Sequence, residues 1–507
     1  MSFAARLVLV AVVLAAAALP KPPAVDEESY LWLGRVVAWA DPYDWSRAWQ
    51  GTEGVVYAHP PLFLWWMKLL SPLGLGGRLP SLGWVALYAL GAATWMKRSC
   101  QHPGYAGAAW LCSSTVLLGI ENSLMIDLPA VALGTCGLAV YREALSRPNS
   151  AAWLGLAGLL LGVAVETKYP AALLVAVVAI HALRVRLAPR HALALAAPLL
   201  GVVVLVEGYV FTRYGEFHPW VAWASRDLVA HGPWDDRALG TLTRLALLPT
   251  AAGLLLAAPL HVVSGTVLGG VLLLACRPPD LGAGSLAALL AFAALGGALL
   301  SRALLATFSP VTRRRKGDRC DSLLLGATVL AVSAGVVLLH NYASARYLLP
   351  AAVPAAILVT RSAEEVAGGK RALLVSTVLA GMVAAASAVA DWRFVTASLE
   401  VARVASASTG VTQFMGEWSF RHGMEASGGE RVSPPLLPGT PVLVDDQSGG
   451  RVPAEWEPIR RFEAEDRFPL RVVDVAAGAG LYAETLGPLP LALGSGPLTS
   501  VTLYEAR

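Results

Sequence analysis

Charged residues are scarce in this chain. Asp, Glu, Lys and Arg make up 15% of its 507 residues and hydrophobic residues 56%, whereas about 25% of a typical soluble protein is charged. A chain with so much apolar surface cannot hide it from water, so most of it is expected to lie in lipid. The net charge of +4 says little by itself, and no nucleic-acid partner is expected.

Cysteine is also scarce. The five cysteines, Cys100, Cys112, Cys136, Cys276 and Cys320, form no CxxC pair. This spacing argues against a disulfide framework and against a zinc site. The chain also shows no internal repeat of solenoid period.

Long apolar segments dominate the first 391 residues. About thirteen of them are expected to be membrane spans: 2–20, 81–97, 105–121, 127–144, 151–166, 168–187, 190–211, 243–259, 262–276, 283–307, 322–340, 346–361 and 372–391. The first could be a signal peptide, but the spans that follow favour an uncleaved helix. The fold class predicted is an all-α polytopic membrane protein with a small α/β domain outside.

The basic loops set the expected orientation. "MKRSCQ", "YREALSR", "RVRLAPRH" and "TRRRKGDR" fall on one side if the spans alternate, and basic loops stay in the cytoplasm. The N-terminus is then cytoplasmic. The first outer loop, 21–80, and the C-terminus lie on the opposite face.

The composition changes after Asp391. Residues 392–507 carry 24 charged side chains among 116, so two domains are expected, 1–391 in the membrane and 392–507 outside it. "TPVLVDD", "FPLRVVDVA" and "SVTLYEA" predict strands, and "GVTQFMGEWSFRHGMEAS" predicts a helix. The glycines of "RVVDVAAGAGLYAE" resemble a nucleotide-binding loop only weakly, because this domain is too short for a doubly wound sheet.

Charged residues gather in the outer loops. Asp26 and Glu27 follow the first span, His59 precedes two prolines, and Asp127, Lys168 and Arg346 stand at the ends of later spans. Polar groups at membrane depth are costly and are functional candidates by default. Ordinary explanations also exist: a solvated loop for the acids, a helix N-cap for Asp127, an aromatic belt around His59, and snorkelling for the cations.

Carboxylates and cations together suit sugar transfer from a lipid phosphate. Cations stabilise the departing phosphate, and a carboxylate takes the proton of an incoming hydroxyl. The stretch "HPPLFLWW" (59–66) is expected to form a stiff apolar wall for the lipid, with His59 facing the phosphate.

The same residues resemble a known family. "DEESYLWLGRVVAWADPYDW" followed by "HPPLFLWW" is similar to the first outer loop of the GT-C membrane glycosyltransferases. The nearer branch is that of the protein O-mannosyltransferases and the lipid A aminoarabinose transferases. Asp26 and Glu27 match the family's acidic pair, Pro60 and Pro61 its prolines, and Asp127 its second aspartate.

The resemblance implies a bundle of about thirteen transmembrane helices in a bacterial inner membrane and transfer with inversion from a polyprenyl-phosphate sugar. The acceptor would be a protein, lipid A or another cell-envelope glycan. Asp26 would be the base, with Asp127 the second catalytic residue. The predicted substrate-binding residues are Glu27, Tyr30, His59, Pro60, Pro61, Lys168, Tyr169, Arg346 and Tyr347.

Two positions depart from the family pattern. His59 replaces a lysine and Ser29 replaces an arginine, so Lys168 and Arg346 are the candidates that grip the phosphate. A histidine that binds phosphate when protonated should make activity fall as pH rises through about 6 to 8.

Other functions stay open. A transporter or lipid flippase would place charges deep within spans, and Glu207 is the main such residue. A scaffold without catalysis would tolerate Asp26→Asn. A divalent cation on Asp26, Glu27 and Asp127 is a further open alternative. Acceptor recognition is the expected task of the outer domain.

Overall fold

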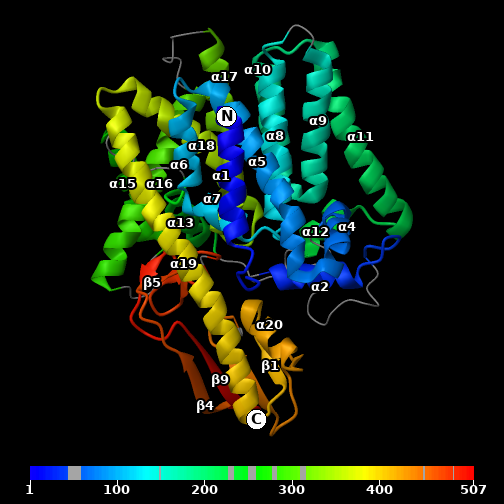
Figure 1. Ribbon diagram of the computed structural model, residues 1–507, viewed down its shortest axis with the longest axis vertical. Coiled ribbons are helices and arrows are strands. Elements are labelled where there is room, and N and C mark those ends of the chain that lie inside the picture. The colour runs from blue at the N-terminus through cyan, green and yellow to red at the C-terminus, as the bar shows by residue number, and fades with distance from the viewer. Residues whose placement is uncertain are drawn as a thin grey trace.

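The structure is a computed structural model that describes residues 1–24, 26–43, 59–147, 150–225, 233–248, 259–276, 282–308, 316–448, 452–483 and 485–507. A bundle of apolar helices occupies one end, and a small strand-containing part hangs from its other end (Figure 1). The long helices of the bundle are α1 (Phe3–Ala17), α5 (Arg78–Ser99), α8 (Asp127–Ala144), α9 (Ser150–Thr167), α10 (Ala172–Arg184), α11 (Pro189–Tyr214), α15 (Pro259–Cys276), α16 (Ala283–Phe308), α17 (Lys316–Leu339), α18 (Leu349–Glu365) and α19 (Gly369–Thr409).

Some of the short helices cover the end of the bundle that faces the strands (Figure 1). Here α2 and α4 lie between the bundle and the outer part, with α12 beside them (Figure 1). The short helices are α2 (Glu27–Val36), α4 (Pro61–Leu70), α6 (Pro103–Leu111), α7 (Ser114–Glu121), α12 (His218–Ser225), α13 (Trp234–Leu245) and α20 (Trp418–Ala426), with the 3₁₀ turns η2 (Ser71–Gly77), η3 (Tyr169–Ala171) and η5 (Ala345–Leu348).

Among the described residues, five helices are long and apolar enough to cross a membrane. They are 150–167, 189–214, 283–308, 321–339 and 369–409. The helical membrane character is therefore confirmed, but the count of about thirteen spans is not. Part of the expected span 243–259 lies outside the described residues.

The expected span 105–121 is not one continuous helix, because two short helices, α6 and α7, replace it. The backbone is extended at Ser113, which precedes α7 (φ −79°, ψ 128°). The Ser113 hydroxyl donates to the carbonyl oxygen of Leu247 at 2.7 Å. Hydropathy registers the apolar composition of this stretch and misses a break that a distant partner stabilises.

The helix α19 crosses the expected domain boundary without interruption and ends only at Gly410, which has a left-handed conformation (φ 67°). Asp391 is completely buried within it, so this charge does not mark the end of a helix. The outer part therefore begins beyond Thr409 and is carried on a continuous rod.

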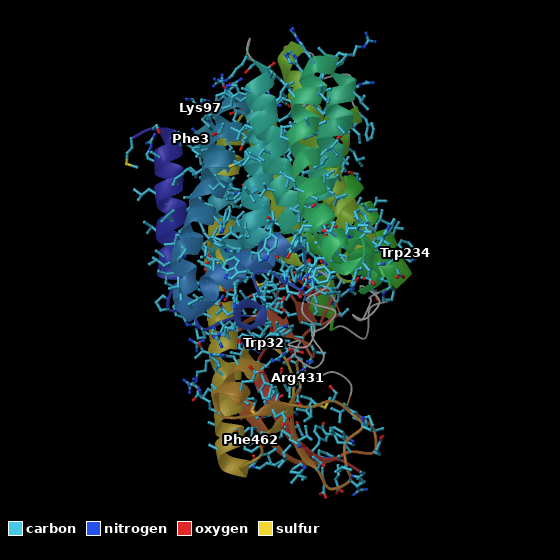
Figure 2. The ribbon with its side chains drawn as sticks, turned by 90° about the vertical axis from the view of Figure 1, so that its right-hand side faces the viewer. Phe3, Trp32, Lys97, Trp234, Arg431 and Phe462 are labelled. Carbon is cyan, nitrogen blue, oxygen red and sulfur yellow. The ribbon has the colours of Figure 1, made fainter. Side chains whose placement is uncertain are left out.

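The outer part is built on a five-stranded sheet in the order β2-β1-β3-β9-β4. β1 is parallel to β2 and β3, and β9 is antiparallel to β3 and β4. Its strands are β1 (Gln413–Met415), β2 (Glu430–Arg431), β3 (Pro441–Asp445), β4 (Glu457–Ala464) and β9 (Thr499–Glu505). Arg431 and Phe462 mark this sheet at the end opposite Lys97 (Figure 2).

The strands expected at 440–446 and 500–506 are confirmed by β3 and β9. The helix expected over 410–427 is only half right, because its first part is the strand β1. Phe414 is fully buried there in register with Leu443 of β3, so pairing across the sheet overrides the local helical pattern.

Candidate functional site

A cavity of about 660 Å³ opens at the end of the bundle beside the outer part. Its walls come from segments far apart in the sequence: the start of α2, the turn before α4, the connection between α9 and α10, the helix α12, and the segment after α17. Of the predicted site residues, Asp26, Tyr30, His59, Lys168, Tyr169, Arg346 and Tyr347 line it.

Two pairs of opposite charge lie at the polar end of this cavity. The guanidinium of Arg346 donates to Asp26 Oδ2 at 2.8 Å, and the ammonium of Lys168 donates to Asp127 Oδ1 at 2.5 Å. Arg346 Nε is also 4.0 Å from Asp127 Oδ2. Each partly buried cation thus has a counter-charge beside it, and together they form a site for an anion with carboxylates at hand.

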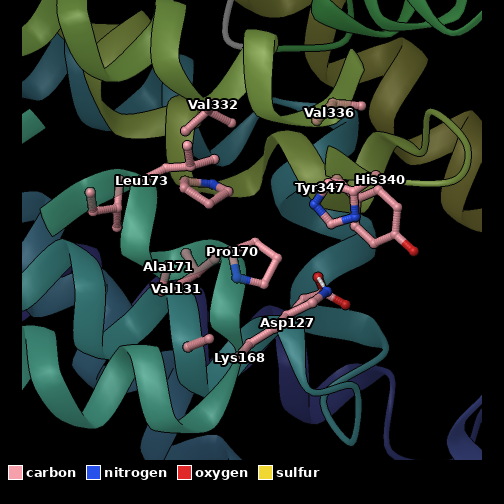
Figure 3. Close-up of a pocket in the computed structure, with 13 residues that line it drawn as sticks. Asp127, Val131, Lys168, Pro170, Ala171, Leu173, Val332, Val336, His340 and Tyr347 are labelled. Atoms are coloured by element: carbon pink, nitrogen blue, oxygen red, sulfur yellow. Dashed lines mark hydrogen bonds and ion pairs between the residues drawn. The ribbon is translucent and has the colours of Figure 1, made fainter. Parts of the chain in front are cut away.

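Aromatic side chains fix the two cations. Arg346 Nη2 donates to the hydroxyl of Tyr342 at 3.0 Å, and Lys168 Nζ lies 4.6 Å from the ring centre of Tyr347. His340 stacks on Tyr347 at 4.0 Å, and both lie near Asp127 and Lys168 around a smaller cavity of about 40 Å³ (Figure 3). Cation–π contacts of this kind hold a cation in place without neutralising it.

His340 and Tyr342 were not among the predicted site residues. Both belong to "HNYASARY", where they precede Arg346 by six and four residues. The density of aromatic and imidazole rings beside a basic residue was the available signal.

His59 lies in the cavity wall at the turn that precedes α4. Its ring meets the rings of Tyr30 and Phe63 edge-on at 5.5 and 5.6 Å. Burial, and after it the charge of Lys168, lowers the pKa of His59 from 6.5 to about 3. This lowered pKa favours a neutral histidine in the free site, so the expected loss of activity between pH 6 and 8 through its deprotonation is replaced by the opposite prediction.

We expect kcat/KM, which reports the free enzyme, to show no His59 titration between pH 6 and 8. Wild type and His59→Gln should give profiles of the same shape when turnover is followed from pH 5.5 to 8.5. A wild-type midpoint near 6.5 that vanishes in the variant would contradict this. The pKa of His59 in the folded state lies below its value in the unfolded state. Protonation of the unfolded chain therefore lowers the free energy of unfolding as pH falls below about 6.5, and His59 has no such effect above that pH.

Glu27 points away from the cavity. Its carboxylate pairs with Arg78 and accepts the backbone N–H groups of Ala24 at 3.1 Å and Leu124 at 3.2 Å. Glu27 and Arg78 are both fully buried. The prediction that Glu27 binds substrate is therefore corrected: it ties the first outer loop to the segment before Asp127.

Pro60 and Pro61 do not line the cavity either. Pro60 precedes α4 with an extended backbone (φ −60°, ψ 151°), and Pro61 is the first residue of that helix, a position that suits proline. Their contribution is to end the loop at His59, so any part that they play in binding would be indirect.

The apolar wall of the cavity differs from the predicted one. Phe63, Leu64 and Met67 of α4 are buried against Tyr30 and Leu31 of α2, and Trp65 and Trp66 do not line the cavity. Instead α12 supplies Trp220 and Trp223, and they are joined by Phe217, which directly precedes α12, and by Val203 of α11. Trp220 is 71% exposed, so this wall is continuous with the outside of the bundle.

A second polar wall lies beside Tyr169. The Tyr169 hydroxyl donates to Glu207 Oε1 at 2.6 Å and bonds to His218 Nδ1. Glu166 lines the cavity next to it. Glu207 is thus buried within α11 but paired with Tyr169 of the cavity wall.

The three metal candidates do not converge. Asp26 is paired with Arg346, Glu27 with Arg78 and Asp127 with Lys168. Within the described ranges, no group of three or more His, Cys, Asp or Glu side chains is arranged to hold a metal ion.

No protein-family model matches the sequence, and no curated protein matches it. Two solved structures are similar to this chain. Both are structures of ArnT, a lipid A aminoarabinose transferase, which belongs to the family that the sequence resembles. They are crystal structures of ArnT from Cupriavidus metallidurans, one in the apo state and one bound to undecaprenyl phosphate.

The identity to ArnT is 17% in both cases. The TM-score is 0.47 for the apo structure and 0.44 for the bound one. The matches cover 79% and 78% of this chain but 64% and 65% of ArnT. The chain therefore spans slightly less than two thirds of the length of these structures.

Proposed function

We propose that this protein is an inverting glycosyltransferase that moves a sugar from a polyprenyl-phosphate carrier to a cell-envelope acceptor on the outer face of the membrane. The observation that carries the proposal is the polar end of the large cavity, where Arg346 and Lys168 each hold a carboxylate. One cavity thus contains cations that can bind a phosphate, a carboxylate that can accept a proton, and an apolar wall that can contact a lipid.

The donor would bind with its phosphate between Arg346 and Lys168. Guanidinium and ammonium groups both bind phosphate, and the partly enclosed setting strengthens each contact. The polyprenyl chain would run along the aromatic wall of α12, where Trp220 and Trp223 are exposed. The sugar would occupy the space between Tyr30 and Tyr169.

Asp26 would act as the base. Its side chain is 31% exposed and lines the cavity, whereas that of Asp127 is only 6% exposed. Phosphate bound to Arg346 competes with the Asp26 carboxylate, which frees Asp26 to accept a proton. The acceptor oxygen then attacks the anomeric carbon while the bond from that carbon to the phosphate oxygen breaks on the opposite face.

Asp127 would orient Lys168 and not exchange protons with the acceptor. It holds the ammonium at 2.5 Å and forms a wall of the two smaller cavities, not of the large one. The polyprenyl phosphate that leaves would carry its new charge toward Lys168 and Arg346, and the acceptor proton would stay on Asp26.

The remaining parts of the proposal concern place and partners. The protein would be a multi-pass protein of a bacterial inner membrane, with a cytoplasmic N-terminus and the strand-containing part on the periplasmic side. The acceptor would be a protein, lipid A or another envelope glycan. A membrane domain within 1–391 and an outer domain within 392–507 remain the proposed division, joined through α19.

A donor panel tests the proposal. Purified protein in detergent is incubated with a set of polyprenyl-phosphate sugars, and the release of free polyprenyl phosphate is measured. We expect turnover with at least one donor. No release with any donor, together with no change in thermal stability on adding polyprenyl phosphate, would contradict the proposal and favour a transporter or a non-catalytic scaffold.

A further inference from the structure

We infer that residues 472–491 of the outer part, called the tail loop below, belong to the scaffold of the site and hold Arg346 in position, with Tyr482 as the positioning residue. The inference rests on the proposed function for its catalytic consequence. Its structural content stands on the contacts that follow.

The tail loop extends from the outer part, and its two ends lie side by side. Its two ends are joined by the antiparallel pair β5 (Leu470–Arg471) and β8 (Ala492–Leu493), in which Arg471 is the partner of Ala492. The excursion then runs toward the bundle and returns, and its own strands β6 (Val473–Asp474) and β7 (Ala479–Gly480) pair with each other.

The loop buries most of its apolar side chains against the membrane bundle and not in the sheet. Leu481 and Val472 belong to the same buried cluster as Tyr30 and Met125, and Leu489 belongs to the main cluster of the helices. The five-stranded sheet has separate cores of its own. The outer domain therefore consists of an independent sheet and a segment whose core is shared with the site.

One backbone contact reaches the residue next to the arginine. The N–H of Ala345 donates to the carbonyl oxygen of Leu481 at 3.1 Å. Leu481 and Tyr482 also line an enclosed cavity of about 20 Å³ together with Asp127 and Arg346. The tail loop thus packs directly behind the anion site, on the side away from the large cavity.

Tyr482 connects the loop to both acidic segments of the site. Its hydroxyl donates to Asp391 Oδ1 at 2.6 Å, and Asp391 is paired with the ammonium of Lys21. Lys21 in turn donates to Asn122 Oδ1 at 2.9 Å. Lys21 precedes Asp26 by five residues and Asn122 precedes Asp127 by five, so this buried network fixes the approach to both carboxylates.

The other end of the loop is held by α13. Arg244, fully buried, donates to the carbonyl oxygen of Gly487 at 3.2 Å and also to that of Gly480, and Thr243 donates to that of Pro488 at 3.0 Å. The glycines allow this fold: a Cβ on Gly480 would lie 2.2 Å from the carbonyl oxygen of Ala483, and one on Gly487 would lie 2.2 Å from that of Gly478. The glycine pattern that resembled a nucleotide loop therefore serves close backbone packing.

The test removes the loop and keeps the sheet. Replacing residues 472–491 by Asn-Gly joins Arg471 directly to Ala492 through a two-residue hairpin turn. Hydrogen exchange of the purified full chain is then compared with wild type. We expect the amides of 341–348 to exchange at least about tenfold faster, because they lose the Ala345–Leu481 hydrogen bond and its packing. The strands β3 and β9 should keep their protection.

A single substitution guards against a folding failure. Tyr482→Phe keeps the ring but removes the hydroxyl that Asp391 accepts, and Tyr504→Phe in β9 is the matched control. For Tyr482→Phe we expect kcat to fall about three- to tenfold, while the donor KM stays within about twofold of wild type. The melting temperature of Tyr482→Phe should be similar to that of Tyr504→Phe.

The outcomes separate this inference from the proposed function. Unchanged exchange at 341–348 in the loop replacement would overturn the inference whatever the protein catalyses, and so would wild-type kcat in Tyr482→Phe. Faster exchange at 341–348, in a wild-type protein that turns over no polyprenyl-phosphate donor, would support the scaffold and reject the proposed function instead.

Discussion

Asparagine in place of Asp26 should reduce the turnover of donor by about 10²–10⁴-fold, the usual contribution of a general base. The substitution conserves the shape of the side chain, which lines the large cavity. It removes the carboxylate that accepts from Arg346 at 2.8 Å. Release of polyprenyl phosphate from the best donor of the panel measures the effect.

Binding should respond in the opposite direction. In Asp26→Asn the guanidinium of Arg346 loses the carboxylate to which it donates at 2.8 Å, so polyprenyl phosphate should bind at least as tightly as to wild type. The matched variant is Arg346→Gln, in which both binding and turnover should be lost. If Asp26→Asn loses binding to the same degree as turnover, Asp26 holds the donor and is not the base.

Methionine in place of Arg78 should destabilise the fold by about 3–5 kcal/mol, the cost of removing one partner from a buried ion pair. Arg78 and Glu27 are 1% and 0% exposed, so the Glu27 carboxylate would be left without its counter-charge inside the protein. Denaturant or thermal unfolding in detergent, with equal protein and lipid content, measures the loss.

Two further variants identify the cause. The double variant Arg78→Met with Glu27→Gln removes both charges. The N–H groups of Ala24 and Leu124 bind different oxygens of Glu27, and the glutamine amide keeps only one of these two acceptors, so the variant should recover part of the loss. Arg98→Met removes a guanidinium that is 53% exposed, and exposed pairs contribute about 0–1 kcal/mol. If Arg78→Met is no worse than Arg98→Met, the pair does not anchor the first outer loop.

The sequence allows the helical class and much of the site to be predicted. Asp26, His59, Lys168 and Arg346 stand in four separate segments, yet all line one cavity. Their convergence was predictable because charged side chains are costly within the hydrocarbon region and are therefore placed in loops. Loops at one end of a helix bundle lie near each other.

Other features depend on contacts that no local pattern encodes. Glu27 and Asp26 are adjacent in sequence, but the partner of Glu27 is Arg78 and that of Asp26 is Arg346. The sequence alone cannot tell which of two neighbouring carboxylates lines the cavity and which is buried in a structural ion pair. The aromatic wall was assigned to Trp65 and Trp66 for a similar reason, since the wall that the structure shows lies on α12, a helix too short to give a strong periodic pattern.

The proposed boundary at residue 391 lies within a helix and not at its end, for a similar reason. A rise in charge marks the point where a helix leaves the apolar region, not the point where the helix ends. Asp391 is buried by Lys21 and Tyr482, neither of which is near in sequence. The strand at Gln413–Met415 likewise depends on neighbours 15 to 30 residues further along the chain.

The continuous helix α19 has a mechanical consequence. Its 41 residues extend about 60 Å at 1.5 Å each, roughly twice the thickness of a bilayer's hydrocarbon core. A rod of this kind, without an internal hinge and anchored beside the site through Asp391, acts as a fixed spacer that keeps the sheet at a constant height. The distance between the sheet and the bundle is therefore set by the length of one helix.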